Sequence, residues 1–188
     1  IKNIVQSLRE QTYKSLEIIV VDNGSKDRTI EIARNLNVTV YDLSKEIDLT
    51  GVKNFRGAQV NFGVNKSQGE IIFFPDADMT FDNELIGEAV EKLKELDALY
   101  VPELVCGQSF FGKIRRFERS FYNQTVIDAL RFVSRNIYEK VGGFDEKNIA
   151  FAPDDWDLTK MIKQVTDKVG ITKKAIYHHE EEMYLRKY

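Results

Sequence analysis

The 188-residue sequence contains one cysteine, Cys106, so it has no internal disulfide. It also lacks any apolar run that approaches the length of a membrane span, and it has no internal repeats or low-complexity tracts. Basic residues are not in excess, because 27 Lys and Arg are balanced by 30 Asp and Glu to give a net charge of -3. Nucleic-acid binders usually carry a basic excess, so no nucleic-acid partner is expected. The single thiol fits a reducing compartment, and we expect a cytoplasmic protein.

The remaining composition is that of a soluble globular domain. Hydrophobic residues make up 43% and charged residues 30% of the chain, which are ordinary values. A chain of this length can form one domain with a substantial core, so we expect a single domain over residues 1–188.

Apolar runs and helix-like stretches alternate along the chain. Strands are predicted at 17–22, 38–42, 71–75, 98–102 and 175–179, and helices at 1–11, 27–36, 57–68 and 83–96. This alternation predicts an α/β fold with a mostly parallel central sheet and helices on both faces. The chain opens on a helix with no strand before it, which is unusual for such a fold.

Residues 71–78, Ile-Ile-Phe-Phe-Pro-Asp-Ala-Asp, are the most informative stretch of the sequence. The apolar run fits a buried strand that ends at Pro75, since proline cannot continue the hydrogen-bond ladder. Asp76 and Asp78 would then lie at the carboxyl edge of the sheet, where open α/β folds bind ligands. Two carboxylates at this spacing suit Mg²⁺ or Mn²⁺ together with substrate phosphates. The alternative is a solvated acidic turn.

Three further segments carry polar side chains that admit two interpretations. Residues 22–25, Asp-Asn-Gly-Ser, predict a sharp turn after a strand. These polar residues either only stabilise the turn or also bind a ligand. Residues 153–158 place an acidic cluster at the start of a helix predicted to reach Val165, where acids also favour the helix dipole. Residues 110–122 interleave aromatic and basic side chains, which predicts either an amphipathic helix or a contact with a membrane surface or an anionic substrate.

Taken in order, five segments resemble the family-2 glycosyltransferases, inverting enzymes with the GT-A fold. The segments are 19–27 (the nucleotide-binding turn), 56–63 (a glycine-containing helix start), 69–78 (the strand that leads to a DxD motif), 138–145 (the segment before the acceptor site) and 154–158 (an ED-x-D-L-like motif). Each motif is weak by itself, but their order and spacing are specific. The resemblance therefore implies a GT-A domain without its first strand.

The resemblance implies a metal-dependent transfer of sugar from a nucleotide-diphosphate donor. Asp78 would hold Mn²⁺ or Mg²⁺ directly, Asp76 would support the metal or the ribose, and His178 would complete the site. The implied base is Asp155, with Asp154 as the less favoured neighbour. The implied nucleotide-binding residues are Asp22, Asn23, Arg56, Asp76 and Ala77.

The resemblance also implies how the chain is divided. The nucleotide-binding part covers about residues 1–100 and the acceptor-side part about 101–188, and the chain is expected to be truncated at both ends. Val60 stands where many relatives carry an arginine, so Arg56, one turn away, is expected to supply that charge. We expect a saccharide or lipid-linked acceptor, and a peripheral membrane contact through residues 113–119.

Two rival interpretations remain. Residues 76–80, Asp-Ala-Asp-Met-Thr, also fit the nucleophile motif of haloacid-dehalogenase-like phosphatases, in which Asp76 would be the nucleophile. That family, however, places its nucleophile strand first in the domain. The other rival is a module that binds nucleotide sugars without turnover.

Overall fold

The computed structural model describes residues 1–106, 113–114, 117–118, 121, 129–149 and 154–179. Helices and strands alternate in the order α1 (Lys2–Arg9), β1 (Ile19–Asp22), α2 (Thr29–Asn35), β2 (Thr39–Asp42), α3 (Leu43–Glu46), α4 (Phe55–Lys66), β3 (Ile71–Phe73), β4 (Met79–Phe81), α5 (Leu85–Lys92), β5 (Ala98–Tyr100), β6 (Glu103–Val105), β7 (Leu130–Ser134), α7 (Arg135–Val141), α8 (Asp154–Val165), β8 (Val169–Ile171) and β9 (Ile176–His178). All five expected strands and all four expected helices are present, and the sequence-based prediction missed β4, β6, β7 and β8.

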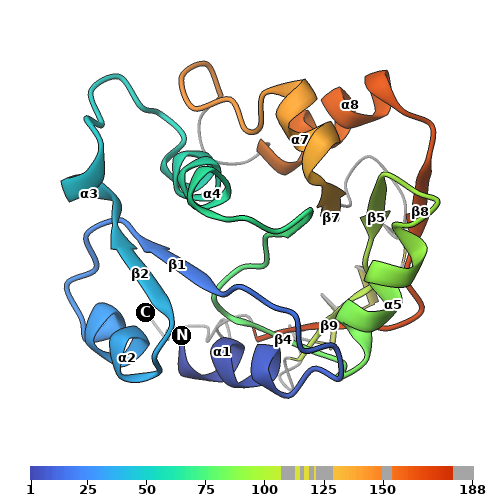
Figure 1. The fold of residues 1–188 in the computed structure, drawn as a ribbon, viewed down its shortest axis with the longest axis horizontal. Coiled ribbons are helices and arrows are strands. Elements are labelled where there is room, and N and C mark those ends of the chain that lie inside the picture. Colours follow the sequence, from blue (N-terminus) through green and yellow to red (C-terminus); the bar gives the residue numbers. More distant parts are fainter. Residues whose placement is uncertain (107–112, 115–116, 119–120, 122–128, 150–153, 180–188) are drawn as a thin grey trace.

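The strands form three sheets with the orders β1-β2, β3-β7-β5-β8 and β4-β9-β6 (Figure 1). β7 runs antiparallel to both β3 and β5, and β9 runs antiparallel to β4. Three of the six described strand pairs are therefore antiparallel, which differs from the expected mostly parallel sheet. The difference arises because β7 and β9, from the second half of the chain, pair with strands of the first half. Antiparallel pairing needs no crossover helix, so alternation along the chain could not reveal it.

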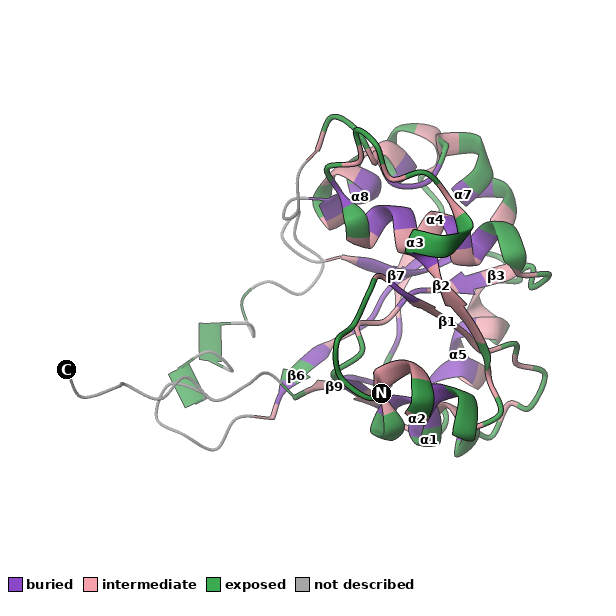
Figure 2. Ribbon diagram, turned by 90° about the vertical axis from the view of Figure 1, so that its left-hand side faces the viewer, coloured by how far each residue is buried: buried purple, intermediate pink, exposed green. Residues whose placement is uncertain are grey.

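Helices cover both faces of the strand layer, as the sequence predicted. Figure 2 shows α4, α7 and α8 on one side of the strands and α1, α2 and α5 on the other. Two apolar clusters lie on these sides: one contains Val64 of α4 and Leu158 of α8, and the other contains Val5 of α1 and Leu85 of α5. β5 contributes Ala98 and Tyr100 to the first cluster and Leu99 to the second, which is the alternation of a strand buried on both faces.

The predicted start and end of α8 are confirmed, and the structure adds a glycine stop at the end of α7. α8 begins at Asp154 within the acidic cluster and ends at Val165. α7 ends at Gly142, whose φ of 84° is the left-handed conformation that glycine adopts without a steric penalty.

Among the residues that the structure describes, no helix has the length and apolar character needed to cross a membrane. The predicted membrane contact through 113–119 falls partly outside the described residues, because Arg115, Arg116 and Arg119 are not among them.

Candidate functional site

Charged side chains from α4, β7, α8 and the segment after β3 meet at one end of the strand layer. Arg56, in the first turn of α4, donates from Nε to Asp76 Oδ1 at 3.1 Å. Its Nη1 donates to Asp155 Oδ1 at 2.8 Å and to Asp154 Oδ2 at 3.1 Å. A single guanidinium therefore connects the first aspartate of the DxD motif with both acids at the start of α8.

A second arginine, Arg131 on β7, lies against the same carboxylates. Its Nη1 is 3.3 Å from Asp76 Oδ2 and 3.9 Å from Asp155 Oδ2. The opposite edge of this guanidinium contacts Glu103 of β6, with Nε 2.9 Å and Nη2 2.5 Å from Glu103 Oε1. The side chains of Arg131 and Glu103 are only 4% and 5% exposed, so this ion pair is buried.

The second aspartate of the DxD motif lies in a different environment. Asp78 is half-exposed, and its Oδ2 is 3.2 Å from Nε2 of His178 at the end of β9. The other ring nitrogen, Nδ1 of His178, is 3.7 Å from Glu103 Oε2. His179 instead contacts Thr80 Oγ1 through Nε2, at 2.8 Å. The structure thus places the side chain of His178, rather than that of His179, beside the Asp78 carboxylate.

The two aspartates that share both arginines have opposite pKa shifts. Burial acts to raise the pKa of Asp76, but the charges of Arg131 and Arg56 outweigh it, so the pKa lies below the ordinary value. Burial raises the pKa of Asp155 above the ordinary value, because desolvation, together with repulsion from Asp154 and Asp76, outweighs the same two arginines. A carboxyl group with a raised pKa in a polar site is a candidate for proton transfer.

Neighbouring motif residues hold Arg56 in place. The side chain of Asn54 caps α4 by accepting a hydrogen bond from Gly57 N at 2.8 Å. The guanidinium carbon of Arg56 lies 5.5 Å from the ring centre of Phe144, in the segment after α7. Gly143, at φ 71°, lets this segment pass close to Asn61, because an added Cβ would lie 2.4 Å from the Asn61 side-chain oxygen. The glycine-rich segment after α7 therefore packs against Arg56 through the Phe144 ring.

Asp154 and Asp155 differ in how completely their carboxylates are paired. Asp154 is 7% exposed in its side chain, and it accepts from the Asp155 backbone N at 3.0 Å as well as from Arg56. The side chain of Asp155 is 24% exposed, so part of it remains accessible to a substrate. Of the two predicted bases, Asp155 has the more suitable environment.

The predicted nucleotide-binding residues lie in two places. Asp76 and Arg56 belong to the charged cluster, and Ala77 is exposed beside them. Asp22 is buried at the end of β1, where its carboxylate accepts hydrogen bonds from the backbone N of Ser25 at 2.8 Å and from the Ser25 hydroxyl. This pairing supports the turn interpretation of Asp22, and a role in binding the nucleotide base, with Asn23 beside it, stays a prediction.

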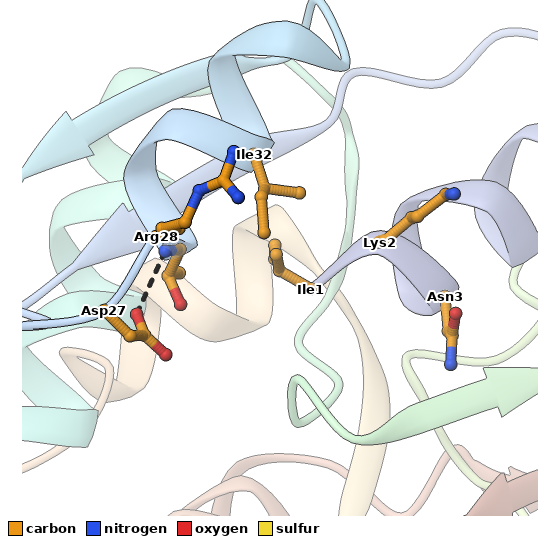
Figure 3. Close-up of a pocket in the computed structure, with 7 residues that line it drawn as sticks. Ile1, Lys2, Asn3, Asp27, Arg28 and Ile32 are labelled. Atoms are coloured by element: carbon orange, nitrogen blue, oxygen red, sulfur yellow. Dashed lines mark hydrogen bonds between the residues drawn. The ribbon is translucent and has the colours of Figure 1, made fainter.

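An open hollow of about 520 Å³ lies between the start of α1 and the start of α2 (Figure 3). Lys2, Asn3, Asp27 and Arg28 line its polar part, and Ile1 and Ile32 approach each other within it. None of its lining residues belongs to the charged cluster, so this hollow is separate from the site described above.

The expected metal fits only part of the predicted ligand set. Mg²⁺ binds octahedrally at about 2.1 Å, so neighbouring ligand atoms are about 3.0 Å apart, close to the 3.2 Å between Asp78 Oδ2 and His178 Nε2. Asp76 does not fit as a ligand, because both of its oxygens face a guanidinium nitrogen. Over the described ranges, no group of three or more His, Cys, Asp or Glu side chains could hold a metal by itself. Asp78 and His178 would therefore need substrate phosphates to complete the coordination.

The sequence analysis missed Arg131 and Glu103. Each lies in an otherwise apolar run, Leu-Arg-Phe-Val at 130–133 and Val-Pro-Glu-Leu-Val at 101–105. A charged residue inside such a run is rarely fully buried unless it is paired. The charged residue inside each apolar run is visible in the sequence, but the pairing of Arg131 with Glu103 is not.

The comparisons with known proteins establish the family. Residues 1–153 match the family described as Glycosyl transferase family 2. This match covers more than half of the chain, which therefore belongs to glycosyl transferase family 2. The glycosyltransferase YkcC of Bacillus subtilis, which is named as uncharacterized, is 33% identical over 156 residues, covering 77% of this chain and 47% of that protein.

A more distant relative and a solved structure agree with this assignment. The O-antigen chain rhamnosyltransferase RfbN of Salmonella typhimurium is 25% identical over 202 residues, covering 94% of this chain and 61% of that protein. The structure of S. aureus TarS 1–349 in complex with UDP-GlcNAc has a TM-score of 0.74 at 18% identity, covering 97% of this chain and 55% of that one. This likeness confirms the GT-A fold. The chain spans about half the length of the curated relatives that it matches.

Proposed function

We propose that this chain carries the catalytic site of an inverting, metal-dependent glycosyltransferase that uses a nucleotide-diphosphate sugar. The observation that carries the proposal is Asp155, a partly exposed carboxylate with a raised pKa inside the Arg56–Asp76 cluster. Family membership supports a glycosyltransferase. The phosphatase alternative is disfavoured, because β1 and β2 precede β3 and both oxygens of Asp76 are held by arginines.

Asp155 acts as the general base in this reaction. Its carboxylate accepts the proton of the acceptor hydroxyl while the hydroxyl oxygen forms a bond to the anomeric carbon of the donor sugar. The bond from that carbon to the diphosphate oxygen breaks, and the nucleoside diphosphate leaves with the electron pair. Because attack and departure occur on opposite faces, a single displacement inverts the anomeric centre. The raised pKa brings the base closer to neutral pH, which favours proton transfer.

The charge of the cluster favours a cation at the leaving-group side. The cluster contains five carboxylates (Asp76, Asp78, Glu103, Asp154 and Asp155) and two guanidinium groups (Arg56 and Arg131), which leaves three negative charges if His178 is neutral. A donor diphosphate adds further negative charge to this site. Asp78 and His178 would hold Mn²⁺ or Mg²⁺, which would neutralise charge on the leaving diphosphate. Asp76 then serves the nucleotide side of the site.

The donor is the part of the function that comparison with solved structures supports. The TarS neighbours are in complex with UDP and with UDP-GlcNAc. We infer that this chain also uses a nucleotide-sugar donor, and that the acceptor is a hydroxyl of a saccharide or of a lipid-linked molecule. A thermal-shift panel of UDP-, GDP- and dTDP-sugars with and without Mn²⁺ identifies the donor. A true donor at 100 times its Kd adds about 2.7 kcal/mol and raises Tm by about 5–10 °C.

Asp155→Asn tests the catalytic assignment. Loss of a general base lowers kcat by about 10²–10⁴-fold, and donor binding in the thermal-shift assay should survive. Asp167→Asn, just after the end of α8 and outside the charged cluster, is the control and should keep its activity. Full activity of Asp155→Asn would refute the base assignment. Donor binding without nucleoside diphosphate release by the unmodified protein would favour the non-catalytic binding module.

A further inference from the structure

Glu103 touches both halves of the charged site. Its Oε1 accepts from Nε and Nη2 of Arg131, and its Oε2 is 3.7 Å from Nδ1 of His178. Through Arg131 it reaches Asp76 and Asp155, and through His178 it reaches Asp78. A single buried carboxylate therefore lies between the proposed base and the proposed metal ligands.

The backbone places Arg131 in this position through an irregularity in β7. Leu99 of β5 pairs with Phe132 and Tyr100 pairs with Leu130, so Arg131 has no partner residue on β5. Such a bulge re-aims the side chain of the extra residue, and bulges are frequent beside active sites. Arg131 Nη1 is buried and makes no hydrogen bond to any residue that the structure describes. It faces Asp76 and Asp155 at ion-pair distance instead.

Fold stability alone does not explain this arrangement. A buried ion pair is often no more stabilising than two apolar side chains of the same size, because desolvation offsets the Coulomb attraction. An apolar pair would also fit the neighbouring strands, since Leu130 and Phe132 on either side of Arg131 already pack in the two cores. Unlike apolar residues, the Arg131–Glu103 pair can orient the charged side chains around it, which are Asp76, Asp155 and His178.

We propose that Glu103 and Arg131 are positioning residues that couple the metal-side pair Asp78–His178 to the base Asp155. The inference rests on the proposed function. Glu103 orients the His178 ring with Nδ1 toward its carboxylate, so that Nε2 is presented beside Asp78. A carboxylate behind a ligating histidine fixes its tautomer and increases its basicity. Arg131 holds Asp76 away from the cation and keeps Asp155 turned toward the reacting hydroxyl.

Mn²⁺ affinity in the presence of UDP, measured by calorimetric titration, tests the metal side. Removing the carboxylate behind a histidine ligand costs about 10–100-fold in metal affinity, and we expect Glu103→Gln to fall in this range. The matched control is the Arg135–Glu139 pair, at 3.4 Å, which begins one residue after β7 and lies outside the site. Glu139→Gln should change Mn²⁺ affinity by less than about twofold, because an exposed ion pair contributes little.

A second set of variants separates positioning from folding. Glu103→Met with Arg131→Met removes both members of the buried pair and leaves Arg56 beside Asp76 and Asp155, so the urea midpoint should fall much less than in Arg131→Met alone. This double variant should still lose about tenfold or more in Mn²⁺ affinity. Arg131→Lys, which keeps the charge, should restore part of the kcat that Arg131→Met loses, with KM for the donor nearly unchanged.

The outcomes distinguish the inference from the proposed function. If the unmodified protein binds Mn²⁺ and both Glu103→Gln and the double variant bind it equally well, the inference is wrong and the proposed function stands. If the unmodified protein binds neither Mn²⁺ nor Mg²⁺ with UDP present, the metal part of the proposed function fails, and the inference fails with it. A stable double variant with weakened Mn²⁺ binding supports the inference.

Discussion

Asp76 and Asp78 are two residues apart, yet they lie in opposite kinds of environment. Asp76 faces two guanidinium groups, and its pKa is lowered by them. Asp78 is half-exposed and has a histidine as its neighbour. The two carboxylates of one short motif therefore have the different environments that their proposed roles require, because the turn after Pro75 sends one toward the arginines and the other toward solvent.

The same contrast separates the two halves of the site. On the base side, Arg56 and Arg131 fix Asp76 and Asp155 through a dense network of short contacts. On the metal side, Asp78 and His178 form a single contact at 3.2 Å. A preorganised base and a more accessible cation site suit a reaction in which the donor brings its phosphates with the metal.

The largest expected effect on stability comes from breaking the buried pair on one side only. Arg131→Met leaves Glu103 without its cation and Asp76 with Arg56 alone, and loss of one partner of a buried ion pair costs about 3–5 kcal/mol. Urea unfolding measures this change. The control is Arg28→Met, whose exposed pair with Glu31 should contribute less than about 0.5 kcal/mol. Equal losses in the two variants would mean that the Arg131 pair is not buried as described.

Asp76→Asn and Asp78→Asn test the contrast directly. Asp76→Asn removes a charge that two arginines share, so we expect a loss of about 2 kcal/mol in unfolding free energy. Asp78→Asn, at a half-exposed position, should change stability by less than about 0.5 kcal/mol. Mn²⁺ affinity should show the reverse order, with the larger loss in Asp78→Asn. Parallel changes in both measurements would contradict the separation of roles.

The sequence predicted the local features of the candidate site better than it predicted the contacts between distant segments. The apolar run before Pro75 and the paired aspartates indicated the position of the site, and the acidic cluster indicated the start of α8 at Asp154. These features depend on local pattern, which a sequence displays directly. The first turn of α4 brings Arg56 to Asp76 and Asp155, and its expected role in place of an arginine at position 60 stays a prediction.

The unpredicted features depend on pairing between distant segments. β7 was missed because Arg131 interrupts its apolar run, and its insertion between β3 and β5 joins residues more than 30 positions apart. The choice between an antiparallel and a parallel neighbour leaves no periodic trace in one sequence. For the same reason, the contact of Glu103 with both Arg131 and His178 became visible only in the folded chain.

The pH dependence of stability should have opposite signs at the two aspartates that share the arginines. Asp76 has a folded-state pKa below its unfolded-state pKa. Its contribution to the free energy of unfolding is therefore fully present above the unfolded-state pKa, and it is lost as pH falls through the folded-state pKa. Asp155 has a raised folded-state pKa, so the folded state binds its proton more tightly and gains stability as pH falls through that value.

Unfolding measured between pH 3 and pH 7, with Asp76→Asn and Asp155→Asn, checks both signs. At pH 7 we expect Asp76→Asn to be destabilising and Asp155→Asn to be neutral or stabilising, and the difference should shrink at low pH. The acid limb of kcat/KM should also lie above the ordinary aspartate pKa of 3.8, because Asp155 must be ionised to act as a base. An acid limb at or below that value would contradict the base assignment.

A smaller effect than that of Asp76→Asn is expected at Asp22, a buried carboxylate that pairs with neutral donors. Ser25→Ala removes the hydroxyl that donates to Asp22, and loss of such a hydrogen bond costs about 1 kcal/mol. This cost should be below that of Asp76→Asn, because hydrogen bonds to neutral groups are weaker than those between charges. If Asp22 also contacts the nucleotide base, Asp22→Asn will weaken UDP binding while Ser25→Ala leaves it unchanged. Equal UDP affinity in both variants would confine Asp22 to the turn.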